Sequence, residues 1–110
     1  MSTENKEQPQ GLDDTFFERA DEHINLANNH LNSKIEPRLV SASLMFSSAR
    51  FNAWVSASGF QNGEELKARK KELLEYFVTQ YASMLEENLD NYADNYDQYM
   101  GISKEQTKDS

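Results

Sequence analysis

Hydrophobic positions recur at intervals of three and four residues along four segments of the chain, and none of these segments alternates as a β-strand would. The segments cover residues 15–32, 37–58, 64–87 and 90–100. Residues 1–12 and 102–110 are polar and cannot offset the entropy of being ordered, so both are expected to be disordered tails. The pattern predicts an all-α single domain over residues 13–101: a compact bundle of three main helices plus a shorter C-terminal fourth helix.

The first helix is predicted to begin at Thr15, because Thr15 and Glu18 have the spacing of a capping box. It should end near Asn32, since Pro37 forces Glu36 out of the helical region. The core stripe expected of this helix is Phe17, Ala20, Ile24, Ala27 and Leu31.

The second helix should begin between Pro37 and Val40 and run to Ser58, with Gly59 in the left-handed position beyond its end. It has two apolar faces, which predicts a central helix between neighbours. One face carries Val40, Leu44, Phe51, Trp54 and Val55, and the other carries Ala42, Phe46, Ala49 and Ala53.

The last apolar segment is long, and a single helix over residues 64–100 would measure about 55 Å. A compact domain of this size has a radius of gyration of about 13 Å, so such a helix would extend beyond its own core. Asparagine and aspartate are weak helix formers, and they concentrate after residue 87. The sequence therefore predicts a break near Asn88 to Asp90, with helices over 64–87 and 90–100. The alternative is an unbroken helix whose end packs on a second subunit.

Charge excludes some partners. The chain of 110 residues has a formal charge of −8, and residues 76–100 contain five acidic side chains and no Lys or Arg. Phosphate backbones would be repelled there, which argues against nucleic acid. The one basic cluster, around Lys70, is interspersed with glutamates at helical spacing and is interpreted as a self-paired, solvated face.

Location and redox chemistry are also constrained. The longest strongly apolar run, Leu44-Met45-Phe46, is far shorter than the roughly 20 residues of a membrane span. The first ten residues show neither the basic start nor the apolar core of a secretory signal. With no cysteine there is neither a disulfide nor a thiolate site. We expect a cytoplasmic protein that does not associate with membranes.

Arg50 is the only charged residue between Leu39 and Gly63, so its guanidinium must find an anion or reach solvent. One interpretation is a site for a carboxylate or phosphate ligand formed by Arg50, His23 and Asn52, between the first and second helices. The simpler interpretation is an internal ion pair, with Glu18, Asp21 or Glu22 as the candidate carboxylates.

A second candidate is a stripe near the C-terminus formed by Leu89, Tyr92, Tyr96 and Tyr99. Tyrosine is common on half-buried surfaces, so a protein partner or a second subunit could cover this stripe. The alternative is that the stripe folds back onto the helical core, which in so small a protein needs covering.

Metal and catalytic sites are not indicated. His23 and His30 stand two helical turns apart, about 10.5 Å, too far for one zinc ion. The window from Asp94 to Glu105 fails as a calcium loop because Tyr96, Gln98 and Tyr99 occupy essential positions. Phosphate-binding loops and nucleophile motifs are missing, so we expect no cofactor and favour a non-enzymatic role.

Several strings resemble a family of small proteobacterial helical proteins that is classed as a domain of unknown function. They are FERADEHINLAN (17–28), VSASL (40–44), ARFNAW (49–54), YFVTQY (76–81) and MLEENLD (84–90). The resemblance implies a bacterial origin and supplies no reaction, ligand or site residue. From the sequence, the leading hypothesis is a helical interaction module, with a homodimer as one form, and the rival is the anionic-ligand site around Arg50.

Overall fold

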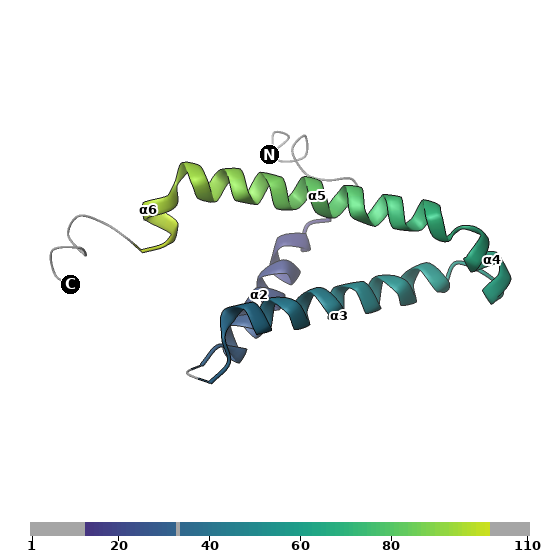
Figure 1. Ribbon diagram of the computed structural model, residues 1–110, viewed down its shortest axis with the longest axis horizontal. Coiled ribbons are helices and arrows are strands. Elements are labelled where there is room, and N and C mark those ends of the chain that lie inside the picture. The colour runs from purple at the N-terminus through teal and green to yellow at the C-terminus, as the bar shows by residue number, and fades with distance from the viewer. Residues whose placement is uncertain (1–12, 33, 102–110) are drawn as a thin grey trace, which may run out of the picture. The chain divides into compact units, whose positions relative to one another are not determined.

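The computed structural model describes residues 13–32 and 34–101, and their regular structure is entirely helical. The helices are α2 (Phe16–His30), α3 (Pro37–Ala57), α4 (Gly63–Ala68), α5 (Lys70–Asp94) and α6 (Tyr96–Tyr99) (Figure 1). Within the described ranges, the β-type contacts are limited to one bridge between Asn32 and Ile35. The all-α prediction is confirmed. The two predicted tails lie outside the described residues.

The chain divides into two compact units, Met1–Val55 and Ser56–Ser110. The first contains α2 and nearly all of α3, and the second contains α4, α5 and α6. The prediction of one domain over residues 13–101 stays a prediction.

In the first unit, the predicted ends of the helices are close to those observed. Thr15 is the N-cap of α2, and α2 ends at His30, two residues earlier than predicted. The connection to α3 is tied by the side chain of Asn32, whose Oδ1 accepts hydrogen bonds from the backbone N of Lys34 at 2.8 Å and of Ile35 at 3.1 Å. These local bonds and Pro37, the first residue of α3, set the two helix boundaries.

The end of α3 differs from the prediction in its conformation. The helix ends at Ala57, where the backbone N of Gly59 donates to the carbonyl of Ser56 at 3.1 Å. The predicted left-handed Gly59 is wrong: among the described residues, positive φ is confined to Gly101, at 73°. The turn after Ala57 closes α3 without a left-handed residue, and Gly101 has the left-handed conformation just after α6.

The two glycines should therefore respond in opposite ways to alanine. A Cβ on Gly59 would lie at an ordinary 3.5 Å from the carbonyl of Ser56, so Gly59→Ala should stabilise the protein by about 0.4–1 kcal/mol through the unfolded state. Gly101→Ala should lower the free energy of unfolding by about 1 kcal/mol and loosen the end of α6, because an L-residue is strained at that φ. Chemical denaturation of both variants, with hydrogen exchange at residues 96–100, checks the pair. Equal effects would contradict it.

In the second unit, the predicted break at Asn88–Asp90 is wrong. The chain instead interrupts the helix at Arg69, between α4 and α5, and at Asn95, between α5 and α6. Helix α4 is capped by Asn62, whose Oδ1 accepts from the backbone N of Glu65 at 2.9 Å, while Glu65 Oε1 accepts from the backbone N of Gln61 at 3.0 Å. The predicted 64–87 and 90–100 helices are thus replaced by a short α4, a continuous 25-residue α5 and a one-turn α6.

Asparagine residues within α5 are accommodated by bonds to their own helix. Asn88 Nδ2 donates to the carbonyl of Met84 at 2.8 Å, four residues back. At the C-terminal end, Asn95 Nδ2 donates to the carbonyl and to Oδ1 of Asn91, each at 3.0 Å. The Asn88 bond lies inside the continuous helix, whereas the Asn95 bonds lie at its end. Asn95 therefore marks where α5 stops, and Asn88 does not.

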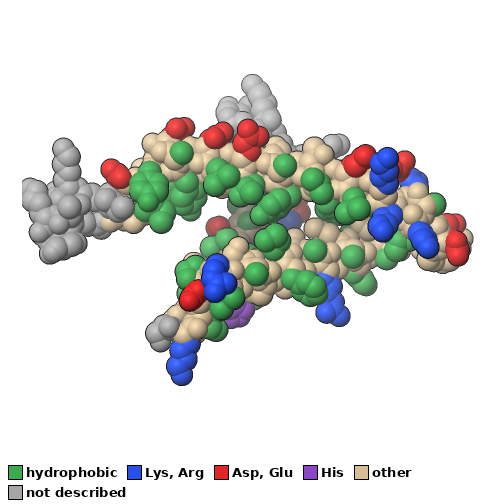
Figure 2. All heavy atoms as spheres, viewed as in Figure 1, with side chains coloured by type: hydrophobic (Ala, Val, Ile, Leu, Met, Phe, Trp, Pro, Cys, Tyr) green, Lys and Arg blue, Asp and Glu red, His purple; other side chains and the backbone are tan. Residues whose placement is uncertain are grey.

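Burial of apolar side chains is slight in the described part of the chain. Val40 is the one buried residue there, with 7% of its surface still exposed. Both faces of α3 were expected to be covered, but Trp54 on one and Phe46 on the other are each 65% exposed. Figure 2 shows hydrophobic side chains gathered along one long side of α5. Side chains on both apolar faces of α3 are therefore exposed, and its place as a central helix stays a prediction.

Candidate functional site

The ligand site around Arg50, His23 and Asn52 stays a prediction, and two of its three residues lie on different sides of α3. Arg50 and His23 are both exposed, and among the described residues neither forms a hydrogen bond or ion pair through its side chain. The internal ion pair expected for Arg50 is therefore absent from residues 13–32 and 34–101. Asn52 is half-buried, and its Nδ2 donates to Ser48 Oγ at 3.5 Å. Two residues along a helix turn the side chain by about 200°, so Arg50 and Asn52 lie on nearly opposite sides of α3.

The C-terminal stripe is exposed. Its four residues are between 45% and 59% exposed: Leu89, Tyr92, Tyr96 and Tyr99. The exposed apolar surface also continues toward the N-terminal end of α5, beyond the four residues that the sequence predicted. We define the α5 stripe as the six apolar residues of α5 that lie within an arc of about 80° of the helix. They are 41–62% exposed, and they are Leu74, Val78, Tyr81, Leu85, Leu89 and Tyr92.

The residues Val78, Tyr81 and Leu85 were missed as surface residues because apolar residues at helical spacing ordinarily form a core. The structure instead half-buries a neighbouring side of α5, which carries Leu73 and Phe77, and leaves the α5 stripe exposed. The signal was present in the sequence: the apolar arc on this helix is too wide for one neighbour to cover.

The end of the stripe has a defined local structure. Because the chain turns at Asn95, Tyr99 returns toward α5, and its ring centroid lies 4.5 Å from that of Tyr92 at an interplanar angle of 31°. Asn91 Nδ2 donates to the hydroxyl of Tyr99 at 3.0 Å. Figure 1 shows α6 turning off the end of α5. The tyrosines are therefore held in place although their surfaces remain exposed, which reduces the entropy that a partner would have to offset.

The opposite side of α5 is acidic. Figure 2 shows acidic side chains along the side of α5 away from its hydrophobic one. On a helical wheel, the acidic residues of 76–100 lie about 100–200° from the centre of the α5 stripe. They are Glu86, Glu87, Asp90, Asp94 and Asp97. This helix therefore has one apolar and one charged side, as a helix does when it packs on one face.

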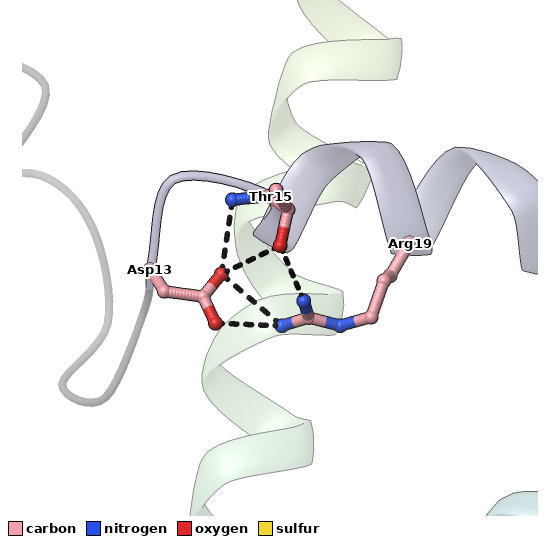
Figure 3. Close-up of polar contacts among 3 residues, drawn as sticks. All are labelled: Asp13, Thr15 and Arg19. Carbon is pink, nitrogen blue, oxygen red and sulfur yellow. Dashed lines mark hydrogen bonds and ion pairs between the residues drawn. The ribbon is translucent and has the colours of Figure 1, made fainter.

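The most connected polar cluster lies at the start of α2 (Figure 3). Asp13 Oδ1 accepts from the backbone N of Thr15 at 3.0 Å and from Thr15 Oγ1 at 3.2 Å, and the carboxylate pairs with Arg19 at 3.3 Å. Thr15 Oγ1 also accepts from Arg19 Nη1 at 2.6 Å, and it makes no capping bond to the helix backbone. The predicted Thr15–Glu18 capping box is wrong, because Arg19 and Asp13 engage the hydroxyl instead.

This cluster shifts the acidity of Asp13. Desolvation raises the pKa of the carboxyl, but the hydrogen bond from Thr15 N and the guanidinium of Arg19 together lower the pKa by more, so it lies below its usual value. A depressed carboxyl pKa stabilises the folded state above the unfolded pKa of about 3.9, and that stabilisation is lost as the pH falls through the folded pKa. The start of α2 should therefore loosen in acid.

The expected result is a fall in the helical character of residues 16–20 as the pH is lowered from about 5 to below the folded pKa of Asp13. Backbone chemical shifts recorded by NMR across this range would show it. In Asp13→Asn the helical character should already be reduced at neutral pH and should no longer change over this range, while Asp14→Asn, one residue along, should retain the change. The same titration in Asp13→Asn as in the unaltered chain would contradict the assignment.

No described helix combines the length and the apolarity needed to cross a lipid bilayer. Nor do residues 13–32 and 34–101 bring three His, Asp or Glu side chains together as a metal site would require.

Comparison with known proteins agrees with the quoted sequence strings. The profile of a protein family of unknown function, DUF3144, matches residues 16–93, which include α2, α3, α4 and almost all of α5. The chain belongs to the DUF3144 family. The resemblance to a family classed as a domain of unknown function is thereby confirmed. Among curated proteins, no match to the chain was found.

A solved relative has the same fold. The chain is 36% identical to the protein NB7890A from Shewanella sp., whose structure was determined by NMR. The alignment covers 86% of this chain and 100% of the other, with a TM-score of 0.69. Shewanella is a proteobacterium, as the resemblance implied. Neither the family nor the Shewanella protein carries a name that states an activity.

Proposed function

We propose that this DUF3144 protein is a non-enzymatic helical interaction module that binds a partner helix along the α5 stripe and the adjoining tyrosines of α6. The observation that carries the proposal is the exposure of six apolar side chains along one side of one helix, at 41–62% each. Apolar side chains exposed singly are ordinary, whereas a contiguous set is typical of a binding surface.

The chemistry of the surface fits another helix better than a small molecule. The α5 stripe runs from Leu74 to Tyr92, a rise of about 27 Å, and helices bind such stripes through apolar residues at matching intervals. Tyrosine provides large contact area with little side-chain entropy to lose, and Tyr92 and Tyr99 are already packed together. Nucleic acid is disfavoured as the partner by the acidic side of the same helix. The cytoplasmic location expected from the sequence is part of this proposal.

The Arg50 site has less support as an alternative. A ligand site needs side chains that converge, and Arg50 and Asn52 diverge on α3. Stabilisation of the protein by an anionic metabolite, abolished by Arg50→Gln, would revive it.

Site-specific photo-crosslinking in proteobacterial cells tests the proposed function. A photoreactive phenylalanine analogue replaces Tyr92 on the stripe in one variant and Asp90 on the acidic side in the matched control. We expect a discrete crosslinked species from position 92 and none from position 90. Absence of a species at both positions, or equal crosslinking from both, would count against binding through the stripe.

A further inference from the structure

The α5 stripe has a symmetric spacing. From Leu74 its residues follow at steps of four, three, four, four and three, and a final step of four reaches Tyr96, the first residue of α6. This series reads the same in both directions from Leu85. The residues four positions away are Tyr81 and Leu89, and those seven positions away are Val78 and Tyr92.

The residue types on the two sides of Leu85 complement one another. Each residue on one side of Leu85 and its equivalent on the other form a pair of one tyrosine and one aliphatic residue. The pairs are Tyr81 with Leu89, Val78 with Tyr92, and Leu74 with Tyr96. Within α5, a two-fold axis through Leu85 would therefore place a tyrosine of one chain opposite an aliphatic residue of the other in the two kinds of layer that flank the Leu85 layer, giving those layers similar volumes.

We infer that the partner of the α5 stripe is the α5 stripe of a second copy of this chain, antiparallel, with Leu85 on the two-fold axis. This inference rests on the proposed function. A two-fold interface is self-complementary by symmetry, so each pair occurs twice and Leu85 meets itself. In a parallel pair in register, each residue would instead meet its own copy. Tyr81 and Tyr92 would form wide tyrosine–tyrosine layers, and Val78 would form a narrow valine–valine layer, so the layers would differ in volume.

The geometry of the helix permits a long contact. Leu74 and Leu85, both in α5, are eleven positions apart, and eleven residues in three turns is close to the natural period of a straight helix. The stripe therefore runs almost along the axis of α5, and two such helices can stay in contact with little supercoiling.

The exposed area reaches the lower range of dimer interfaces. An aromatic side chain buries about 150–250 Å², so the half-exposed Tyr81, Tyr92 and Tyr96 offer roughly 100 Å² each. The four aliphatic residues of the stripe are smaller and offer roughly 50 Å² each. The sum of roughly 500 Å² per chain corresponds to a small, weak interface, below the roughly 800 Å² per partner of a standard one.

Charge favours the same orientation. In the antiparallel pair, Lys70 and Lys71 of one chain lie beside the other chain's C-terminal residues, near Asp94 and Asp97. In a parallel pair, the acidic residues between positions 86 and 97 of the two chains would lie side by side, whereas the antiparallel pair places them beside residues 73–84 of the other chain. The acidic side chains point away from the stripe, so this is a modest, salt-screened preference that adds to the matching of the layers.

Cysteine mapping of the full chain tests the arrangement, and the natural chain contains no cysteine to interfere. Leu85→Cys should form a disulfide-linked dimer under mild oxidation, with about tenfold more product than Glu86→Cys on the outer side. Val78→Cys alone and Tyr92→Cys alone should link poorly, whereas an equimolar mixture of the two should give the mixed dimer. Light scattering of the unaltered chain from about 1 to 100 µM should show twice the chain mass at the upper end.

Two results would overturn the inference. Efficient linkage of Val78→Cys to itself would establish a parallel pair, and monomer mass with no linkage at position 85 would exclude self-pairing. The photo-crosslinking experiment keeps the two proposals distinguishable. If position 92 still gives a discrete species in cells and its mass is not twice that of the chain, the stripe binds another protein, and the proposed function stands while the self-pairing falls.

Discussion

Replacing Asn88 with proline is expected to lower the free energy of unfolding by about 3 kcal/mol. Asn88 lies inside α5, where its backbone N–H belongs to the helix and its side-chain Nδ2 donates to the carbonyl of Met84 at 2.8 Å. Proline removes both bonds, and its ring collides with that carbonyl. Chemical denaturation followed by circular dichroism measures the loss.

The control is Asn88→Ala, which also loses the side-chain bond but keeps the backbone N–H. Alanine has the higher helix propensity, so its effect should stay within about 0.5 kcal/mol in either direction. The comparison separates two pictures of the chain. If α5 were broken at residues 88–90, as the helix propensities suggested, proline there would cost no more than alanine.

Leu85→Asp should raise the dissociation constant of the antiparallel dimer about 100-fold or more. Leu85 lies on the inferred two-fold axis, so one substitution removes two leucines from the contact and sets two carboxylates against each other. Full burial of a leucine contributes about 1.5–3 kcal/mol, and association covers only the 41% of each Leu85 that is still exposed, so the two leucines contribute roughly 1–2.5 kcal/mol. Two carboxylates removed from water and facing each other cost several kcal/mol more, which brings the total past roughly 100-fold. Sedimentation equilibrium over a range of concentrations gives the constant.

Two control variants separate a lost contact from a damaged helix. Leu85→Met keeps the volume and polarity of the site and should leave the dimer nearly unchanged. Glu86→Asp introduces the same side chain as Leu85→Asp, with its low helix propensity, but on the outer side of α5, and it should have little effect on association. Because Leu85 is already 41% exposed in the single chain, the helix content of Leu85→Asp should remain near that of the unaltered chain. Similar association by Leu85→Asp and Glu86→Asp would remove Leu85 from the interface.

Helix limits that depend on local chemistry could be predicted from the sequence. Thr15 marks the start of α2, and α3 was expected to run to Ser58 and ends at Ala57. Pro37 and the polar residues that precede it act within one turn, so no knowledge of the tertiary structure was needed. The hydrogen-bond partners of the Thr15 side chain could not be predicted in the same way. A capping box with Glu18 and a bond from Arg19 to the Thr15 hydroxyl are both possible within the first turn, and the structure has the second.

The break in the last segment was misplaced for two physical reasons. Propensity scales score asparagine as weak because its amide competes with the backbone, yet Asn88 satisfies a carbonyl of its own helix. Compactness is also a guide only for a chain that buries its apolar side chains within its own core, whereas the α5 stripe is exposed. The alternative, one unbroken helix over residues 64–100, is wrong as well, because the helix is interrupted at Arg69 and at Asn95.

The tyrosine end of the candidate surface was predicted in part. Leu89, Tyr92, Tyr96 and Tyr99 share a side at helical spacing, and that much follows from the sequence. The contact between the rings of Tyr92 and Tyr99 depends on the turn at Asn95. The sequence predicted the break in this helix several residues earlier, near Asn88 to Asp90. Which apolar side chains remain exposed depends on what packs against them, so the full stripe could be recognised only in the structure.

The chromophores of the chain are divided between its two units. The single tryptophan, Trp54, lies in Met1–Val55 with the ring of Phe51 5.8 Å away, and all five tyrosines lie in Ser56–Ser110. Light absorbed at the red edge, where tryptophan alone is excited, therefore reports on the first unit only. Emission from the tyrosines reports on the second unit. An unlabelled sample can thus show in a single titration whether the two halves unfold together or in succession.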